Sequence, residues 1–171
     1  LRISGDKTDL LGINREYENR TQTIAGELGI APEVVAFIEP EGYLVTKFIE
    51  GRPIPPEELK QPQNLAQVAS ILNEIHAMPS IPGVFSPFMV VRNYTKIAQQ
   101  HNVTFPEKFD WLISQMNDAE AAMMNTSRIQ RPCHNDLLNG NFLLANKLYV
   151  LDWEYAGMGD VFFDLANFSN N

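Results

Sequence analysis

The chain has 171 residues and a mass of 19.3 kDa, enough for one domain or slightly more. Apolar residues make up 44% and charged residues 20%, a balance that excludes wholesale disorder and can supply a core. The net charge of −8 argues against a nucleic-acid-binding protein. The sequence also has no run of about 18 apolar residues that could span a membrane.

The single cysteine, Cys133, cannot form an internal disulfide, which predicts a reducing compartment and hence a cytoplasmic protein. The chain begins with Leu1 rather than methionine. We therefore expect it to be a piece of a longer polypeptide. The composition of the chain does not indicate an oligomeric state.

The first third of the chain predicts a strand end, a helix and a β-hairpin, followed by a linker. Asn14 can cap a helix that runs to about Leu28. The predicted strands are Leu1–Ile3, Val34–Glu39 and Tyr43–Ile49. Glu50–Pro56 has the Pro- and Gly-rich composition of a linker, and we expect a domain boundary there.

The remainder of the chain is mainly helical in pattern. Helices are predicted over residues 64–78, 91–101 and 109–123, and another begins near residue 161. The apolar stripes of residues 65–76 and 109–123 mark two of these as core helices. Two short β-rich runs, residues 142–145 and 148–151, flank Asn146-Lys147 and predict a second hairpin.

The chemistry concentrates around this second hairpin, where His134, Asp136 and Asn141 form an H-x-D-x-x-x-x-N pattern. If Asn146-Lys147 is a two-residue turn, Asn141 lies directly opposite Asp152, with Cβ atoms roughly 4.5–5.5 Å apart. A carboxylate facing an amide oxygen suits a hard divalent cation.

The charges of the segment 132–171 support a metal site. It carries one base, Lys147, and five acids: Asp136, Asp152, Glu154, Asp160 and Asp164. A site this acidic would repel a polyphosphate unless metal ions bridged the two, so the pattern indicates metal-assisted phosphoryl chemistry. Alternatively, Asp160 forms a turn and Asp164 holds a loop, and His134 is an architectural hydrogen-bonding residue rather than a base.

These residues resemble the choline/ethanolamine kinase family, which belongs with the aminoglycoside phosphotransferases in the protein-kinase-like fold. The resemblance covers nearly the whole chain. It is carried by Cys133–Leu137 with Asn141, Leu151–Tyr155, Asn14-Arg15 with Glu18, Gly29–Pro32, Phe48–Gly51 and Asp164–Asn167. Asn135 and Glu154-Tyr155 favour the choline kinase branch.

The resemblance implies an α+β, bilobal fold with a catalytic β-hairpin. Residues 1–50 would be a partial, β-rich small lobe on the nucleotide side. Residues 51–171 would be a mainly helical large lobe without its C-terminal helices. The phosphate-covering loop and the C-terminal acceptor pocket would lie outside this sequence.

The resemblance also implies roles for single residues. Asp136 would be the catalytic base, and Asn141 and Asp152 the magnesium ligands. On the nucleotide side, Arg2 would approach the phosphates, and Glu18 would be its ion-pair partner, or Glu16 if the helix register differs. Beside the adenine would lie Phe48, Ile49 and Glu50. Tyr155 and Glu154, with Asp136, would bind the acceptor, while His134 and Asp164 would support the site.

The activity implied is transfer of a phosphoryl group from ATP, with Mg²⁺, to the hydroxyl of a small cationic alcohol, choline or ethanolamine. Another small-molecule kinase of this fold, for an aminoglycoside, thiamine or a sugar, stays open, as does a non-catalytic nucleotide-binding pseudokinase. A metal-dependent hydrolase is a weaker alternative. The expected partner is the small-molecule substrate, with no nucleic acid and no membrane span.

Overall fold

The computed structural model describes residues 1–3, 5, 8–124 and 129–170. The chain forms two compact units. The first comprises residues 1–84 and 130–171, and the second comprises residues 85–129. The lobe boundary expected near residue 50 stays a prediction.

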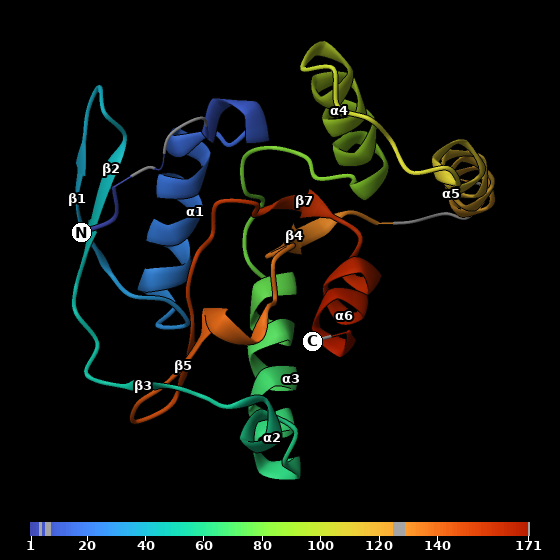
Figure 1. Ribbon diagram of the computed structural model, residues 1–171. Coiled ribbons are helices and arrows are strands. Elements are labelled where there is room, and N and C mark those ends of the chain that lie inside the picture. The colour runs from blue at the N-terminus through green and yellow to red at the C-terminus, as the bar shows by residue number, and fades with distance from the viewer. Residues whose placement is uncertain (4, 6–7, 125–128, 171) are drawn as a thin grey trace. The chain divides into compact units, whose positions relative to one another are not determined.

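The first unit begins with a helix whose ends follow from local sequence signals (Figure 1). After a short 3-10 helix, Thr8–Leu11, α1 spans Arg15–Glu27. The Asn14 side chain caps it by accepting a 3.0 Å hydrogen bond from the amide of Tyr17. Gly29 then takes a φ of +73°, a conformation that glycine adopts without steric cost, and the helix ends. The helix predicted over 14–28 is therefore confirmed.

An antiparallel hairpin of β1 (Val34–Ile38) and β2 (Tyr43–Thr46) packs beside α1. A bulge interrupts its register between Val34 and Ala36. On the other edge of β2, the amide of Arg2 donates a 2.8 Å hydrogen bond to Leu44. The strand end predicted at residues 1–3 thus pairs with the hairpin, and this pairing carries the Arg2 side chain toward the site.

The rest of the first unit, from residue 52 onward, is built from short strands and three helices. The strands β3 (Arg52–Pro53), β5 (Phe142–Leu144) and β6 (Leu148–Val150) form one antiparallel sheet, and β4 (Arg131–Cys133) pairs with β7 (Gly157–Gly159). The helices are α2 (Pro56–Leu59), α3 (Pro62–His76) and α6 (Val161–Ser169). Asp160 caps α6 by accepting from the amide of Phe162.

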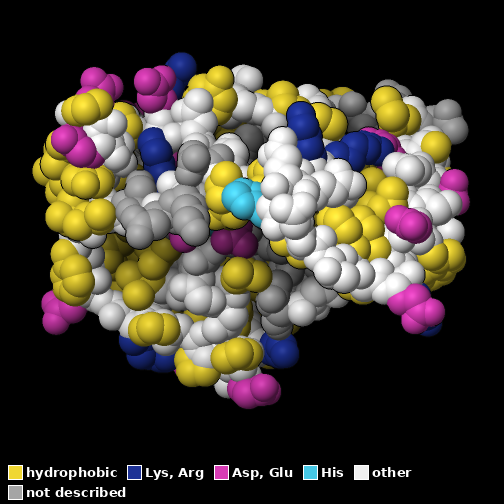
Figure 2. Space-filling model, turned by 45° about the horizontal axis from the view of Figure 1, so that its top comes forward, with side chains coloured by type: hydrophobic (Ala, Val, Ile, Leu, Met, Phe, Trp, Pro, Cys, Tyr) yellow, Lys and Arg dark blue, Asp and Glu magenta, His cyan; other side chains and the backbone are white. Residues whose placement is uncertain are grey.

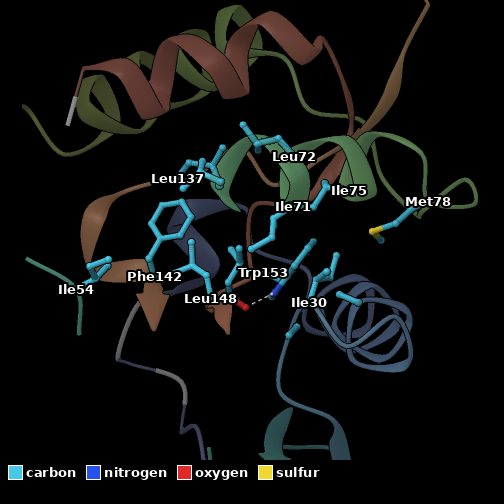
Figure 3. Packing of buried hydrophobic residues seen from close by; sticks show 14 of the residues in the cluster. Ile30, Ile54, Ile71, Leu72, Ile75, Met78, Leu137, Phe142, Leu148 and Trp153 are labelled. Atoms are coloured by element: carbon cyan, nitrogen blue, oxygen red, sulfur yellow. Dashed lines mark hydrogen bonds between the residues drawn. The ribbon is translucent and has the colours of Figure 1, made fainter. Parts of the chain in front are cut away.

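One hydrophobic core joins these elements (Figure 3). Side chains from α3, the β5–β6 hairpin and the segment after α1 meet in it, and Trp153 lies at its centre, fully buried. The indole of Trp153 donates a 3.1 Å hydrogen bond to the carbonyl of Val150, the dashed line in Figure 3. Because Ile30 also accepts a bond from the amide of Val150, the segment after α1 is fixed to the hairpin that leads to Asp152.

The register predicted for the second hairpin is wrong by one residue. The strands pair Leu144 with Leu148 and Phe142 with Val150, so the loop has three residues, 145–147, rather than two. Asn141 therefore lies opposite Leu151, whose amide donates to its carbonyl at 2.8 Å. Asp152 follows the strand with a φ of +64° and does not face Asn141 across a ladder.

The second unit consists of α4 (Pro87–Gln100) and α5 (Phe109–Met124), which pack against each other. Ser86 caps α4, and Pro87 occupies its first turn, so the helix begins four residues before the predicted start at 91. Arg92 binds Glu120 across the pair, at 3.0 Å for one hydrogen bond. The prediction that residues 109–123 form a core helix is wrong for this unit, because two helices alone bury none of their residues fully.

Among the described residues, no helix is both long and apolar enough to cross a membrane. On the face shown in Figure 2, the Lys and Arg side chains of the described residues are scattered among apolar and acidic ones.

Candidate active site

The candidate catalytic loop follows β4 and carries His134, Asn135 and Asp136. Asn135 has a φ of +65°, a left-handed conformation that a residue with a Cβ adopts only with support from its surroundings. Its Nδ2 supplies part of that support by donating to the carbonyl of Tyr155 at 3.0 Å. The sharp turn at Asn135 sets the direction of the next side chain, Asp136.

Acceptors from α6 hold the backbone of this loop. The carboxylate of Asp164, fully buried, accepts from the amide of Asn135 at 2.7 Å and from that of His134 at 3.1 Å. One turn later on α6, the Asn167 side chain accepts from the amide of Leu137. These contacts support the structural role proposed for Asp164 from the sequence.

His134 is fully buried and makes a hydrogen bond through each ring nitrogen. Its Nδ1 accepts from the amide of Asp136 at 3.2 Å, so the proton lies on Nε2, which donates to the carbonyl of Leu151 at 3.0 Å. Burial is the main cause that lowers the pKa of His134 from its ordinary value. A neutral ring thus links the loop to the residue before Asp152, which is an architectural role rather than that of a base.

Asp136 is half-buried and fixed by Asn141. The amide Nδ2 of Asn141 donates to the Asp136 carbonyl at 2.8 Å and to its Oδ2 at 3.0 Å. Burial raises the pKa of Asp136 most; the hydrogen bond from Asn141 lowers it, and the nearby charges of Asp152 and Glu154 raise it. The structure therefore brings Asp136 and Asn141 together, with Asp152 close enough to affect the titration.

Asp152 has a carboxylate oxygen suited to a cation. Its Oδ1 is buried and accepts no hydrogen bond, although it lies 3.0 Å from Nη1 of Arg2 in an ion pair. The Arg2 guanidinium therefore neutralises this oxygen, which without a hydrogen bond still has lone pairs that a metal ion can use. Because Asn141 uses its nitrogen on Asp136, its own side-chain oxygen is also left for a cation. These two oxygens fit a hard divalent metal.

Beside Asp152, two arginines and two glutamates form an ion-pair network. Arg2 binds both Glu18 and Glu154, and Arg15 binds the same two carboxylates at 2.7 and 3.0 Å. Glu18 is buried, whereas Glu16 is exposed. The prediction that Glu18 rather than Glu16 faces Arg2 is confirmed. Glu154 binds both arginines, and its expected role at the acceptor stays a prediction.

A cavity of about 330 Å³ opens next to this network. It is lined by Arg2, Glu18, Gln22, Pro32, Leu44, Thr46, Leu151 and Asp152. Glu18 on α1, Arg2 beside β2 and Asp152 after the second hairpin therefore face the same space.

The remaining residues expected at the site lie on two other segments. Phe48, Ile49 and Glu50 follow β2 in an irregular segment, with Phe48 exposed by 92%. Tyr155 is half-buried next to the catalytic loop. Reasoning from the sequence noted Arg15 but gave it no role in the site, although its position three residues before Glu18 on one helix favours an ion pair.

Cys133 precedes the catalytic loop and is fully buried, as expected of a small core residue. Burial raises the pKa of its thiol to about 12. At pH 8, about one thiol in ten thousand is then ionised, so the folded protein should resist a disulfide reagent such as DTNB. After denaturation, the single cysteine should react with one equivalent of the reagent. Ser114→Cys, on the exposed side of α5, is the reactive control. Equally fast labelling of native Cys133 would contradict the buried position.

Comparison with known proteins identifies relatives along the whole chain. The sequence profile "Choline/ethanolamine kinase" matches residues 1–171. Protein LicA of Haemophilus influenzae is 30% identical over 162 residues, 90% of this chain and 59% of its own length. The crystal structure of a choline/ethanolamine kinase family protein from Mesorhizobium loti superposes with a TM-score of 0.83 at 29% identity, covering 98% of this chain and 56% of that one.

A more distant likeness concerns the fold alone. Aminoglycoside phosphotransferase APH(4)-Ia, at 21% identity, superposes with a TM-score of 0.65 over 90% of this chain and 60% of that one. The α+β protein-kinase-like fold expected from the sequence is therefore confirmed. The chain spans a little over half the length of the relatives named above. With the family profile matched from end to end, the chain belongs to the choline/ethanolamine kinase family.

Proposed function

We propose that the full-length protein transfers the γ-phosphoryl group of ATP, with Mg²⁺, to the hydroxyl of a small cationic alcohol, either choline or ethanolamine. The observation that carries this proposal is the placement of Asp136: a half-buried carboxylate fixed by Asn141 and near the Asp152 carboxylate, whose Oδ1 accepts no hydrogen bond. Membership of the family supports small-molecule kinase activity in general. ATP as the donor, Mg²⁺ as the metal and a cationic alcohol as the acceptor are the specific points that we propose.

Asp136 is proposed to accept the proton of the acceptor hydroxyl. A general base must lie within hydrogen-bond reach of that proton and stay free of the metal. The Asn141 amide fixes the Asp136 carboxylate through one oxygen, Oδ2, and leaves the other for the hydroxyl. Burial raises the pKa of Asp136, which makes its carboxylate a stronger base than an exposed aspartate.

Asn141 and Asp152 would hold Mg²⁺, and Arg2 would approach the nucleotide phosphates from the side of α1. When bound, the ion neutralises the phosphate charge that the Asp152 carboxylate and its acidic neighbours would otherwise repel. Glu18 and Glu154 keep the Arg2 guanidinium at the edge of the cavity. One solved relative, LicA, was crystallised in complex with AMP, which supports an adenine nucleotide as donor; the irregular segment Phe48–Glu50 would lie beside the adenine.

A cationic acceptor is favoured by the charge of the catalytic segment. The protein has a net charge of −8, and Asp136 has Asp152 and Glu154 nearby. Tyr155, which lies next to the loop, would offer an aromatic face to an ammonium group. The buried free thiol of Cys133 and the use of ATP support a cytoplasmic location.

The test measures phosphoryl transfer by the full-length protein with ATP and Mg²⁺ to choline, ethanolamine, an aminoglycoside, thiamine and a neutral sugar. We expect kcat/KM for choline or ethanolamine to exceed that for the sugar by at least about tenfold, because the acidic segment attracts a cation. Tetramethylammonium, a cation without a hydroxyl, should inhibit competitively. Preference for the sugar would refute the charge argument, and preference for the aminoglycoside or thiamine would reassign the acceptor.

A further inference from the structure

Behind the catalytic loop, three polar side chains from three elements meet at one point. His76 ends α3, Cys133 ends β4 and Asp164 lies in the first turns of α6. Their Nε2, Sγ and carboxylate oxygen atoms all lie within 4.8 Å of one another. None of these residues belongs to the set proposed to contact the nucleotide or the acceptor, so the cluster needs its own account.

Asp164 is the centre of this cluster because its buried carboxylate collects the donors. Oδ1 accepts from the amide of Asn135, and Oδ2 accepts from the amide of His134 and from Nε2 of His76 at 2.9 Å. The carboxylate has no exposure to solvent, while the His76 side chain keeps 16% of its surface exposed. Of these three donors, only His76 comes from outside the catalytic loop, and only its side chain can carry a positive charge.

The loop depends on the position of this carboxylate. A buried carboxylate that lacks a donor must either move toward another donor or take up a proton. Both outcomes change its bonds to the amides of His134 and Asn135. Asn135 is the residue at φ +65°, a left-handed conformation that asparagine tolerates and that the hydrogen bond from its amide to Asp164 holds in place. Asp136 is the next residue, so displacement at Asn135 is transmitted directly to the proposed base.

We propose that His76 is a positioning residue for the catalytic loop: it fixes the Asp164 carboxylate, which in turn holds Asn135 and orients Asp136. The effect on turnover rests on the proposed function, whereas the effect on the loop does not. His76 acts through Asp164 and touches no substrate, so its loss should change turnover rather than nucleotide binding.

A structural metal at this point is the competing explanation, since histidine, cysteine and aspartate are all metal ligands. The hydrogen bonds disfavour it, because both oxygens of Asp164 already accept from N–H donors of His76, His134 and Asn135. The contacts form a complete hydrogen-bonded cluster without an ion.

The experiment compares His76→Gln with His76→Met in the full-length protein. The two new side chains have the same length and flexibility, and only glutamine keeps an N–H donor in the place of Nε2. We expect His76→Met to lower kcat at least tenfold with KM for ATP within twofold, and His76→Gln to stay within threefold of the wild type in both. His101, exposed at the end of α4, gives the matched control His101→Met, which should leave both constants unchanged.

A second measurement follows amide hydrogen exchange at His134 and Asn135, which does not depend on activity. Exchange there should accelerate at least tenfold in His76→Met and remain slow in His76→Gln. Wild-type exchange rates and wild-type kcat in all variants would overturn the proposal. Equal losses in His76→Gln and His76→Met would also overturn it, because the N–H donor would then not matter. If His76→Met does not fold, His76→Ala takes its place in the comparison. A wild-type protein inactive on every acceptor refutes the proposed function, while the exchange data still decide the role of His76.

Discussion

Asp136→Asn is expected to lower kcat by about 10²- to 10⁴-fold in the full-length protein, the range that loss of a general base produces. Asparagine has nearly the same shape, so Asn141 keeps a partner, but a neutral amide cannot accept the proton of the hydroxyl. Since Asp136 is not among the residues lining the cavity beside Arg2, KM for ATP should change little. Steady-state kinetics with saturating acceptor measures both constants.

Asp118→Asn is the matched control for this experiment, because Asp118 is exposed on α5 and the substitution removes the same charge. It should leave kcat unchanged. If Asp136→Asn retains wild-type kcat and KM, another residue is the base. If it loses ATP binding as well, Asp136 contributes to the nucleotide or metal site and its role as a free base is wrong.

Asp152→Asn is expected to abolish magnesium-dependent turnover. The loss in kcat should exceed roughly 100-fold, which is the upper end for removing a residue that only supports a metal ligand. The buried Oδ1 of Asp152 accepts no hydrogen bond and is therefore the oxygen proposed to bind the ion. Its negative charge also faces Arg2 at 3.0 Å. An amide keeps an oxygen there but loses the charge that attracts the ion.

The measurement for Asp152→Asn is a titration of Mg²⁺ against turnover and against binding of ADP. The variant should need a much higher Mg²⁺ concentration for either, whereas ADP binding without the metal should persist or improve, since a carboxylate near the phosphates has been neutralised. Asp118→Asn again serves as the control. Turnover near the wild-type value at the same Mg²⁺ dependence would rule out Asp152 as a ligand.

The elements that the sequence predicted well are those with local signals. Asn14 and Gly29 bound α1 because a cap and a left-handed glycine act within one turn of the helix. The hairpin of β1 and β2 follows from alternating β-rich runs around a turn. The motif residues Asp136 and Asn141 were found for the same reason: they lie five positions apart, and a single loop brings them into contact.

The position of Asp152 could not be predicted from the same reasoning. Asn146-Lys147 fits a two-residue turn by composition, but Ala145 also leaves the ladder and its amide donates to the carbonyl of Lys147. One extra loop residue shifts every pairing in the hairpin. The left-handed φ of Asp152 then redirects its side chain, and nothing in the residue type of an aspartate announces that conformation.

The partners of Glu154 and His76 were also beyond sequence reasoning. Glu154 binds arginines 139 and 152 positions earlier, and His76 binds an aspartate 88 positions later. Pairings of this length depend on how the elements pack, which composition and periodicity do not encode. The sequence indicated that the chain has an acidic site, but not which acid binds the arginines and which one binds the loop.

The support of the catalytic loop by α6 has a consequence for the order of folding. The amides of His134, Asn135 and Leu137 are held by Asp164 and Asn167, residues synthesised about 30 positions later. A nascent chain that has reached residue 160 already contains Asp136, Asn141 and Asp152 but not the acceptors that shape the loop. The loop that carries Asp136 can therefore take the arrangement described above only after α6 has been synthesised and has packed against it.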